Sequence, residues 1–589
     1  MSNQQISKLF KDVAAAYSIK NEKKYYFQMI AYQKASEAVE GLTSELKDLY
    51  KEKKLESVPG IGPTIRLRLE ELFKKGHVKH FDWVLKGIPK GVFALIDIPT
   101  IGPKKAYKLA VEFSLNSEET AIEDLLTVAK AGKIAKLPTF GEKSQEDIQR
   151  ALMEYKEGKG KAKRMVLPFA AELAGKLVSY LLKSKSISEA TPLGSLRRMK
   201  PTVGDIDIAV ASDNPKEAIK HFISYPYKER IIEEGPSTAS ILTSGGKQVD
   251  LMVQPKMGFG SLLQHFTGSK NHNVHLREYA LKKKLSLSER GIKDLKDKKS
   301  KIKQFDKEEK FYNALGLDWI PPEMREDTGE IELSMAHKLP KIIELSDIKG
   351  DLHVHSNFPI EPSHDLGKNS IEEMVKKARE LKYEYIGFSE HNPSVSKHNQ
   401  KEIYDLISRR NVIIEQLNSE NKDIRILKML EVDILSNGKL AIDGKCLDLS
   451  DCVIVSIHSA FSMNKKTMTE RVIKGLSHPK ARILAHPTGR LLNDRTGYDL
   501  DFEKIFDFCK KNNKVLEINA WPTRLDLPDS LIRAAVEKGV KLIIDTDSHA
   551  LWQMGLMKYG VAMARRGWAK KDDILNTLGY NDFIKWLKS

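Results

Sequence analysis

The sequence predicts a multidomain protein with an all-α N-terminal region, an α+β middle region and a C-terminal (β/α) barrel. Residues 1 to about 85 carry Lys, Ala, Leu and Glu at helical spacing and lack convincing strand runs. From residue 151, short apolar runs of strand length appear between helical segments. From residue 349 onward, strand and helix alternate about seven times. Alternation of this kind is typical of a (β/α) barrel.

The composition indicates a polyanionic partner. The 589 residues carry a formal net charge of +17, and basic residues crowd the first half. An anionic membrane surface is the rival explanation of that charge. However, no apolar run approaches the roughly 18 residues of a membrane span, and the N-terminus lacks a secretory signal pattern. The three cysteines form no C-x-x-C pair, so we expect reduced thiols in a cytoplasmic protein without a membrane partner.

Three glycine-containing hairpins lie between helical segments of the N-terminal region. They read Val58-Pro-Gly-Ile-Gly-Pro, Ile98-Pro-Thr-Ile-Gly-Pro and, more weakly, Leu137-Pro-Thr-Phe-Gly-Glu. A single copy would favour an ordinary tight turn. Three copies resemble helix-hairpin-helix elements, whose backbone N–H groups bind DNA phosphates without reading sequence. The residues assigned to DNA binding are Gly60, Gly62, Ile101, Gly102 and Gly141.

Three carboxylates of the middle region are candidates for a two-metal site. The stretch that begins Gly194-Ser-Leu-Arg-Arg reads as a phosphate-binding turn, and Asp205 and Asp207 follow it on a predicted strand. Residues two apart on a strand face the same side, so both can share metal ions. Asp250 interrupts a second apolar strand. A solvated pair at a strand edge is the alternative, but the turn, the arginine pair and Asp250 favour catalysis.

These motifs resemble the palm of the family X DNA polymerases, the group of DNA polymerase beta. The resemblance implies a nucleotidyltransferase palm that adds nucleotides to a primer with Mg²⁺ or Mn²⁺. It implies that Asp205 and Asp207 bind both metals. Asp250 would bind the catalytic metal and help to deprotonate the primer 3′-hydroxyl.

The same resemblance implies a nucleotide site beside the carboxylates. Ser195 and Arg198 would hold the triphosphate, while Asn273 and Arg277 would meet the nascent and template bases. One departure is that His265 stands where the family usually has its sugar-gating aromatic residue. The full nucleotide-binding set is Gly194, Ser195, Arg198, Gly204, His265, Phe266, Thr267, Gly268, Asn273 and Arg277.

A 5′-deoxyribose phosphate lyase activity of polymerase beta is expected to be weak or absent here. Thr64 and Arg68 stand where that family has lysines. An arginine stays protonated and cannot form a Schiff base, so only Lys74 or Lys75 would substitute.

The barrel region places metal-ligand residues at successive predicted strand ends. His353 and His355 alternate on one strand face, as two ligands of one site would. A single histidine at a strand end is usually structural, but a series at successive strand ends is not. The order of motifs resembles the polymerase and histidinol phosphatase (PHP) domain, a distorted (β/α)7 barrel. That resemblance implies two or three Mn²⁺ or Zn²⁺ ions acting on a phosphoester, with the ligands His353, His355, His391, Glu431, His458, His486, Asp547 and His549.

Two further assignments in the barrel follow from the same resemblance. His364 and Asp365 compete for one additional ligand position, in a turn longer than the family pattern. Arg490 is a candidate for binding a substrate phosphate, and an ordinary surface arginine is an equal alternative.

The order of domains resembles bacterial and archaeal family X polymerases. It implies a DNA repair enzyme, a monomer, that fills short gaps, trims 3′ ends, and acts on gapped or primer-template DNA with deoxynucleoside triphosphates. The alternatives are a template-independent nucleotidyltransferase, a small-metabolite phosphatase with a DNA-tethering front half, and a non-catalytic DNA-end scaffold. The predicted domains are 1–85 (helical, with helix-hairpin-helix), 86–150 (helical, fingers-like), 151–257 (palm), 258–320 (thumb), 321–348 (linker) and 349–589 (PHP phosphoesterase).

Overall fold

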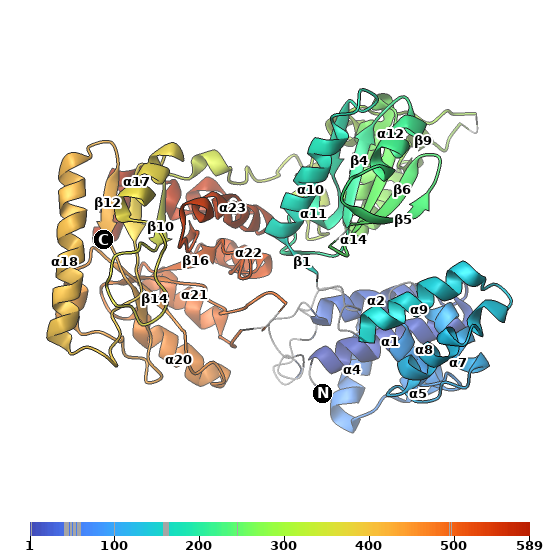
Figure 1. The fold of residues 1–589 in the computed structure, drawn as a ribbon, viewed down its shortest axis with the longest axis horizontal. Coiled ribbons are helices and arrows are strands. Elements are labelled where there is room, and N and C mark those ends of the chain that lie inside the picture. Colours follow the sequence, from blue (N-terminus) through green and yellow to red (C-terminus); the bar gives the residue numbers. More distant parts are fainter. Residues whose placement is uncertain are drawn as a thin grey trace. The chain divides into compact units, whose positions relative to one another are not determined.

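The chain folds into two compact units, Met1–Lys163 and Arg164–Ser589 (Figure 1). The computed structural model describes residues 1, 3–40, 46, 50, 55, 61–98, 101–156, 164–243, 245–297, 299–493, 495 and 497–589. Gly60, one of the predicted DNA-binding residues, lies outside this described part. None of the helices in the described ranges combines the length and apolar character needed to span a bilayer.

The N-terminal unit is helical in its described residues, as the sequence predicts. Two hydrophobic cores hold it together, one formed by α1, α2, α4 and α5 and the other mainly by α6 to α9. In the first core, the Phe10 ring packs edge-on against Tyr32 and Phe81. The helices are α1 (Asn3–Asn21), α2 (Tyr26–Glu40), α4 (Pro63–Lys75), α5 (Lys79–Leu85), α6 (Gly91–Leu95), α7 (Pro103–Glu112), α8 (Ala121–Lys130) and α9 (Glu142–Lys156).

The predicted boundary at residue 151 is wrong, because it cuts α9 in two. Ala151 and Leu152 are buried in the second helical core. Their burial holds the last turns of α9 in the N-terminal unit, whose boundary falls after Lys163.

The palm is a five-stranded mixed sheet of order β2-β4-β7-β6-β5. On β4, Ile206 and Ile208 face the large core that includes α10 and α12, whereas Ala209 packs with α13 on the other face. Asp207 is two residues before Ala209 on the same strand, so its side chain lies on the same face of the sheet, the face that packs with α13. The elements are β2 (Glu189–Pro192), β4 (Ile206–Ala211), β5 (Lys228–Glu234), β6 (Thr238–Thr243), β7 (Gln248–Gln254), α10 (Leu167–Leu181), α11 (Gly194–Arg197) and α12 (Pro215–Ile223), with a small ribbon of β1 (Met165–Val166) and β3 (Thr202–Val203).

The predicted thumb, residues 258–320, contains a β-hairpin between its helices. Its helices are α13 (Phe259–Thr267), α14 (Lys270–Lys282) and α15 (Glu308–Ala314). Between the last two, β8 (Leu285–Ser288) pairs antiparallel with β9 (Gly291–Asp294). The apolar alternation of β8 spans only four residues among lysine clusters, which explains why the sequence pattern conceals it.

The segment 321–348, expected to be a linker, is folded and partly buried. It contains η4 (Pro322–Met324), α16 (Glu330–Met335) and η5 (Leu345–Asp347). Met324, Ile331 and Ile342 share a core with Trp568, which follows α23 (Met557–Arg566) of the barrel. A charged side chain of this segment is paired inside the protein: Arg325 Nη1 donates to Glu308 Oε1 at 2.7 Å.

The C-terminal region is a distorted parallel barrel, which confirms the predicted (β/α)7 fold. Isolated parallel bridges, His391–Glu431 and Val354–Ser548, connect its two sheets. The strands are β10 (Gly350–Val354), β11 (Tyr385–Phe388), β12 (Arg425–Lys428) with β13 (Glu431–Asp433) at one strand position, β14 (Val453–Ser456), β15 (Ala481–Leu484), β16 (Val515–Asn519) and β17 (Leu542–Asp545). The helices are α17 (Ile371–Glu380), α18 (Gln400–Glu420), α19 (Gly444–Asp448), α20 (Lys465–Leu476), α21 (Phe502–Lys511), α22 (Asp529–Lys538), α23 (Met557–Arg566) and α24 (Tyr580–Lys588).

The two ends of the barrel differ in character. Phe583 of α24 stacks on Tyr385, at the start of β11, with ring centroids 5.0 Å apart. Apolar packing thus fills the amino ends of the strands. The opposite, carboxyl ends carry the polar residues, as in other (β/α) barrels.

Candidate active sites

The three predicted carboxylates meet at one end of the palm sheet. Asp207 on β4 pairs in register with Asp250 on the parallel strand β7, and Asp205 lies immediately before β4. Burial, together with the charges of Asp205 and Asp250, raises the pKa of Asp207 to about 7. Mutual repulsion of this kind is relieved by a divalent cation, so the donor set fits the predicted metals.

Two neighbours hold Asp250 in place. The Ser240 hydroxyl donates to its Oδ1, and Gln248 Nε2 donates to Oδ1 and Oδ2 at 3.0 and 3.1 Å. The turn at Gly194 approaches the same site closely. Gly194 has φ +56°, and a Cβ there would lie 2.6 Å from Asp207 Oδ2. Only glycine therefore permits this approach.

Arg198 lies between the Gly-Ser turn and the Thr267-Gly268 segment. Its Nε donates to Glu326 Oε1 at 3.0 Å, and its guanidinium also donates to the Thr267 carbonyl. A Cβ at Gly268 would come within 3.0 Å of the guanidinium. The structure thus brings together three members of the predicted nucleotide set. Arg197 is directed elsewhere, because it forms a two-point ion pair with the buried Glu308 at 2.9 and 2.6 Å.

Three other predicted nucleotide residues, His265, Asn273 and Arg277, line a small pocket between α13 and α14. Asn273 Nδ2 donates to the His265 carbonyl at 2.6 Å, and Gln264 Nε2 donates to Asn273 Oδ1 at 2.9 Å. Arg277 Nε donates to the Asn273 carbonyl at 3.1 Å. Burial lowers the pKa of His265, which favours the neutral ring. Gln264 is an addition that the sequence patterns did not single out.

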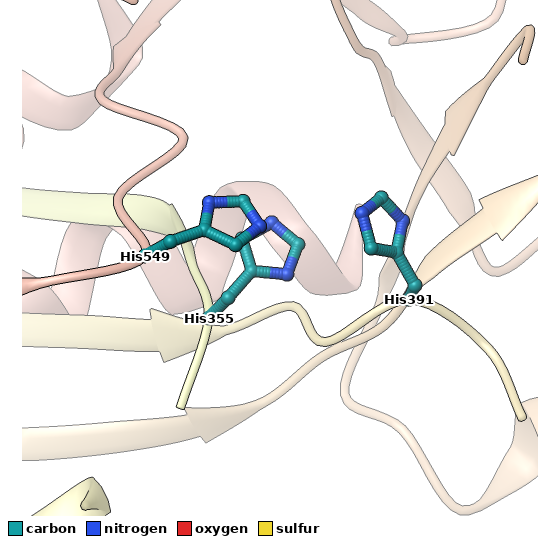
Figure 2. Close-up of side chains that lie close together, drawn as sticks. All are labelled: His355, His391 and His549. Carbon is teal, nitrogen blue, oxygen red and sulfur yellow. The ribbon is translucent and has the colours of Figure 1, made fainter. Parts of the chain in front are cut away.

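The histidines of the barrel converge at the carboxyl ends of its strands. Figure 2 shows His355 and His549 with their rings stacked, and His391 on the facing side. The His355 and His549 ring centroids are 4.0 Å apart, and those of His355 and His391 are 4.8 Å apart. Three segments far apart in the sequence thus supply one cluster.

Glu431, His353, His355 and Asp547 form a first group of potential metal ligands in the barrel. Glu431 Oε2 lies 3.2 Å from His353 Nε2 and 3.8 Å from His355 Nε2. Asp547 Oδ1 lies 3.6 Å from His353 Nε2 and 3.3 Å from His355 Nε2. Four donors therefore surround one position.

The opposite carboxylate oxygen of Glu431 serves a second group. Its Oε1 lies 3.4 Å from His458 Nε2 and 3.1 Å from His486 Nε2. A carboxylate that bridges two such groups is a common feature of multinuclear metal sites.

Asp365 belongs to a third group with His391 and His549. Its Oδ1 lies 3.3 Å from His391 Nε2, and its Oδ2 lies 3.5 Å from His549 Nε2. His364, the other residue considered for this position, lies beside His391, with ring centroids 4.9 Å apart, and forms a separate candidate ligand group with Asp433 and His458. Its Nε2 lies 3.3 Å from Asp433 Oδ1, next to the His458 ring.

Unpaired buried nitrogen atoms show that these groups suit metal ions. His353 Nε2, His355 Nε2 and His549 Nε2 are buried, and none has a hydrogen-bond partner among the described residues. Burial, with the charges of His549 and His391, lowers the pKa of His355 well below its usual range, so that its ring is a neutral donor. Imidazole and carboxylate together fit Zn²⁺, Mn²⁺ or Fe²⁺.

Two carboxylates that the sequence patterns did not assign orient the histidines. Glu517 Oε1 lies 2.6 Å from His353 Nδ1, and Asp433 Oδ1 lies 2.7 Å from His458 Nδ1. Each carboxylate leaves the Nε2 of its partner directed at the cluster, as metal-ligating histidines require. Glu517 lies within β16 and Asp433 ends β13, in the motifs Glu-Ile-Asn and Glu-Val-Asp, and these motifs were the available signal in the sequence.

Arg490 is not directed at the cluster. Its guanidinium donates to the carbonyls of Arg524, at 2.9 Å, and Leu525. Arg524 instead lies 3.8 Å from Asp547 Oδ2. Arg524 thus lies beside the proposed ligand Asp547, in a loop that Arg490 supports.

The hairpins of the N-terminal unit share one arrangement in their described residues. Ile61, Ile101 and Phe140 are buried, and an exposed glycine follows each one. Gly62 and Gly102 are the N-cap residues of α4 and α7, with proline in the first turn and no side-chain cap. Backbone N–H groups at these helix starts are therefore available to a phosphate.

Comparisons with known proteins match every region of this architecture. A helix-hairpin-helix domain matches residues 1–78, the DNA polymerase beta thumb matches residues 262–326, and the PHP domain matches residues 351–520. The chain is 27% identical over 215 residues to a probable phosphatase of Clostridium acetobutylicum, covering 35% of this chain and 80% of that protein. It is 23% identical over 311 residues to DNA polymerase lambda of Rattus norvegicus, covering 49% of each chain.

One relative matches from end to end. The DNA polymerase/3′-5′ exonuclease PolX of Bacillus subtilis is 32% identical over 593 residues, covering 100% of both chains. This match confirms the resemblance drawn from the motifs. The chain belongs to the family X DNA polymerases that carry a C-terminal PHP domain, the PolX family.

Proposed function

We propose that the protein is a DNA-dependent DNA polymerase that fills short gaps in DNA repair and trims 3′ ends with its PHP domain. The observation that supports this most strongly is the presence in one chain of paired palm carboxylates and a histidine and carboxylate cluster in the barrel, on a scaffold related to PolX over its whole length. Gap filling in base excision repair, in the cytoplasm and as a monomer, is the setting that we propose.

In the palm, Asp205, Asp207 and Asp250 would hold two Mg²⁺ or Mn²⁺ ions. Bound ions would activate the primer hydroxyl and stabilise charge on the phosphates. The chain itself contributes positioning: Ser240 and Gln248 fix the orientation of Asp250.

The nucleotide would bind between the Gly-Ser turn and α14. Ser195 and Arg198 would hold the triphosphate of the incoming deoxynucleotide. Asn273 and Arg277 are fixed by the hydrogen bonds around His265, so they would present a defined edge to the base pair. This arrangement favours templated synthesis over template-independent addition.

In the PHP domain, three donor groups would hold up to three Mn²⁺ or Zn²⁺ ions. Bound ions would activate water and polarise the scissile phosphodiester. Glu517 and Asp433 orient His353 and His458, and Arg524 offers a cation beside Asp547. We assign the ligands as His353, His355, Asp365, His391, Glu431, His458, His486, Asp547 and His549.

A small-metabolite phosphatase is the second candidate, because the PHP region alone resembles a probable phosphatase. That relative covers 35% of this chain, and a phosphatase has no use for the carboxylate triad of the palm. The polymerase with a DNA-directed exonuclease therefore remains the better account.

The test uses a 5′-labelled primer on a duplex with a one-nucleotide gap, in Mn²⁺, with and without the four deoxynucleotides. We expect templated extension with nucleotides and stepwise shortening without them. Phosphate release from small phosphomonoesters, with no change in the primer, would support the phosphatase instead. Asp547→Ala with His549→Ala is the matched control, since it should stop shortening and spare extension.

A further inference from the structure

Arg566, at the end of α23 in the PHP domain, reaches the phosphate-binding turn of the palm. Its Nη1 donates to the carbonyl of Arg198 at 2.7 Å and to Glu326 Oε1 at 3.0 Å. The same Glu326 oxygen accepts from Arg198 Nε at 3.0 Å. One carboxylate thus connects an arginine of the PHP domain with an arginine of the palm.

The contact is buried and densely charged. The Arg566 side chain is 1% exposed, and its Nη2 donates to Asp529 at the start of α22. Lys200 Nζ lies 3.6 Å from Glu326 Oε2. Three positive and two negative groups leave this cluster with a net charge of +1.

The positive excess depends on Arg566. Burial alone would raise the pKa of Glu326, but the charges of Arg566, Lys200 and Arg198 outweigh it and lower that pKa. Glu326 is therefore ionised. Without Arg566, its negative charge would interact only with Arg198 and Lys200 among the three cations of the cluster. Arg198 would then be held more firmly by Glu326 and would be a weaker partner for an anion.

We propose that Arg566 is a positioning residue for the incoming nucleotide, through which the PHP domain sets the triphosphate affinity of the palm. The proposal rests on the proposed role of Arg198 in triphosphate binding. Arg566 acts in two ways: it fixes the Arg198 backbone through the carbonyl, and it shares Glu326 so that Arg198 keeps charge available for phosphate. It touches neither the nucleotide nor the PHP ligands.

Arg565 provides a matched control on the same helix. Its guanidinium donates to Glu323 at 2.8 Å, Glu344 at 2.6 Å and the Ile343 carbonyl at 2.8 Å. It therefore ties α23 to the segment 321–348 without contacting the turn that carries Arg198. A loss of general domain packing would affect both arginine variants alike.

The experiment measures equilibrium binding of a deoxynucleoside triphosphate to the full chain on gapped DNA with a dideoxy-terminated primer. Arg566→Gln should raise the nucleotide Kd about tenfold, and Arg565→Gln should change it less than about twofold. The double variant Arg566→Gln/Glu326→Gln restores the net charge and should recover the affinity to within about threefold of the wild type. Equal Kd values for the two arginine variants, or no recovery in the double variant, would overturn the proposal.

Two further measurements keep the result interpretable. If Arg566→Gln does not fold, Asp529→Asn changes the same charge balance in the opposite direction and should lower the Kd, and an unchanged or higher Kd would overturn the proposal. Extension of an ordinary primer by the wild type is assayed separately. Failure of the wild type to extend would refute the proposed polymerase, whereas extension together with an unaltered Kd in Arg566→Gln would refute only the role of Arg566.

Discussion

Asp207 and Asp250 face each other in register on the parallel strands β4 and β7. Because the strands are parallel, carboxylates 43 positions apart in sequence emerge side by side, and burial with neighbouring charge raises the pKa of Asp207 to about 7. This pair is the basis of the palm site, and the first prediction tests it.

Asp207→Asn should reduce nucleotide addition by about 1,000-fold or more, because it removes a donor to both proposed ions. Shortening of the primer should continue at the wild-type rate, since the PHP donors are separate. Primer extension and primer shortening on the same gapped duplex measure both activities. Asp213→Asn, an exposed carboxylate after the same strand, is the control. Retained synthesis in Asp207→Asn would refute the palm assignment.

Asp365→Asn should lower the metal content of the purified protein by about one ion per chain, whereas His364→Gln should leave it unchanged. The reason is that Asp365 contacts both His391 and His549, and His364 contacts Asp433 instead. Elemental analysis after dialysis against metal-free buffer measures the content. The opposite result would assign the ligand position to His364.

Gly102→Asp should stabilise α7 and weaken DNA binding at the same time. Nothing lies within 4 Å of a Cβ at Gly102, so the aspartate fits as an N-cap and stabilises the helix by a few tenths of a kcal/mol. Its charge would repel a DNA phosphate, and the affinity at low salt should fall about tenfold.

Gly102→Asn separates the two effects, because it caps the helix without the charge. Binding of a labelled gapped duplex across a salt series, with thermal melting of each variant, measures both. An equal loss of affinity in the asparagine and aspartate variants would show that charge at this hairpin is irrelevant to DNA binding.

Glu308→Gln should destabilise the Arg164–Ser589 unit at neutral pH by about 3 kcal/mol. Burial alone would raise the pKa of Glu308, but Arg325 and Arg197 outweigh it and lower that pKa to about 2. A carboxyl with a depressed folded-state pKa stabilises the protein above its unfolded pKa, near 4.5, and the contribution is lost as pH falls from 4.5 through 2.

Denaturant unfolding at several pH values measures this effect. The wild type and Glu308→Gln should differ most above pH 5 and approach each other toward pH 2. Glu309→Gln, an exposed neighbour, is the control. A difference that stays constant with pH would show that the ionised form of Glu308 is not what stabilises the unit.

The sequence alone identified the side chains that we propose for the chemistry. Asp205, Asp207 and Asp250 were identifiable because metal-ligand chemistry depends on residue type, and because the period of a strand puts residues two apart on one face. His353 and His355 follow the same rule. The strand–helix alternation also predicted the barrel. Because parallel barrel strands share one carboxyl end, it predicted as well that His353 and His355 would lie at that end.

Only the tertiary structure decided how these groups are paired. The contacts of Asp365 with His391, and of His364 with Asp433, depend on the path of one loop across the barrel mouth, which no periodicity encodes. The segment 321–348 reads as a linker because its charges look solvated, yet Arg325 pairs with Glu308 inside the protein. The link from Arg566 to Arg198 spans 368 positions. Such pairings depend on which distant segments are brought into contact, and that is settled by the packing of the whole unit.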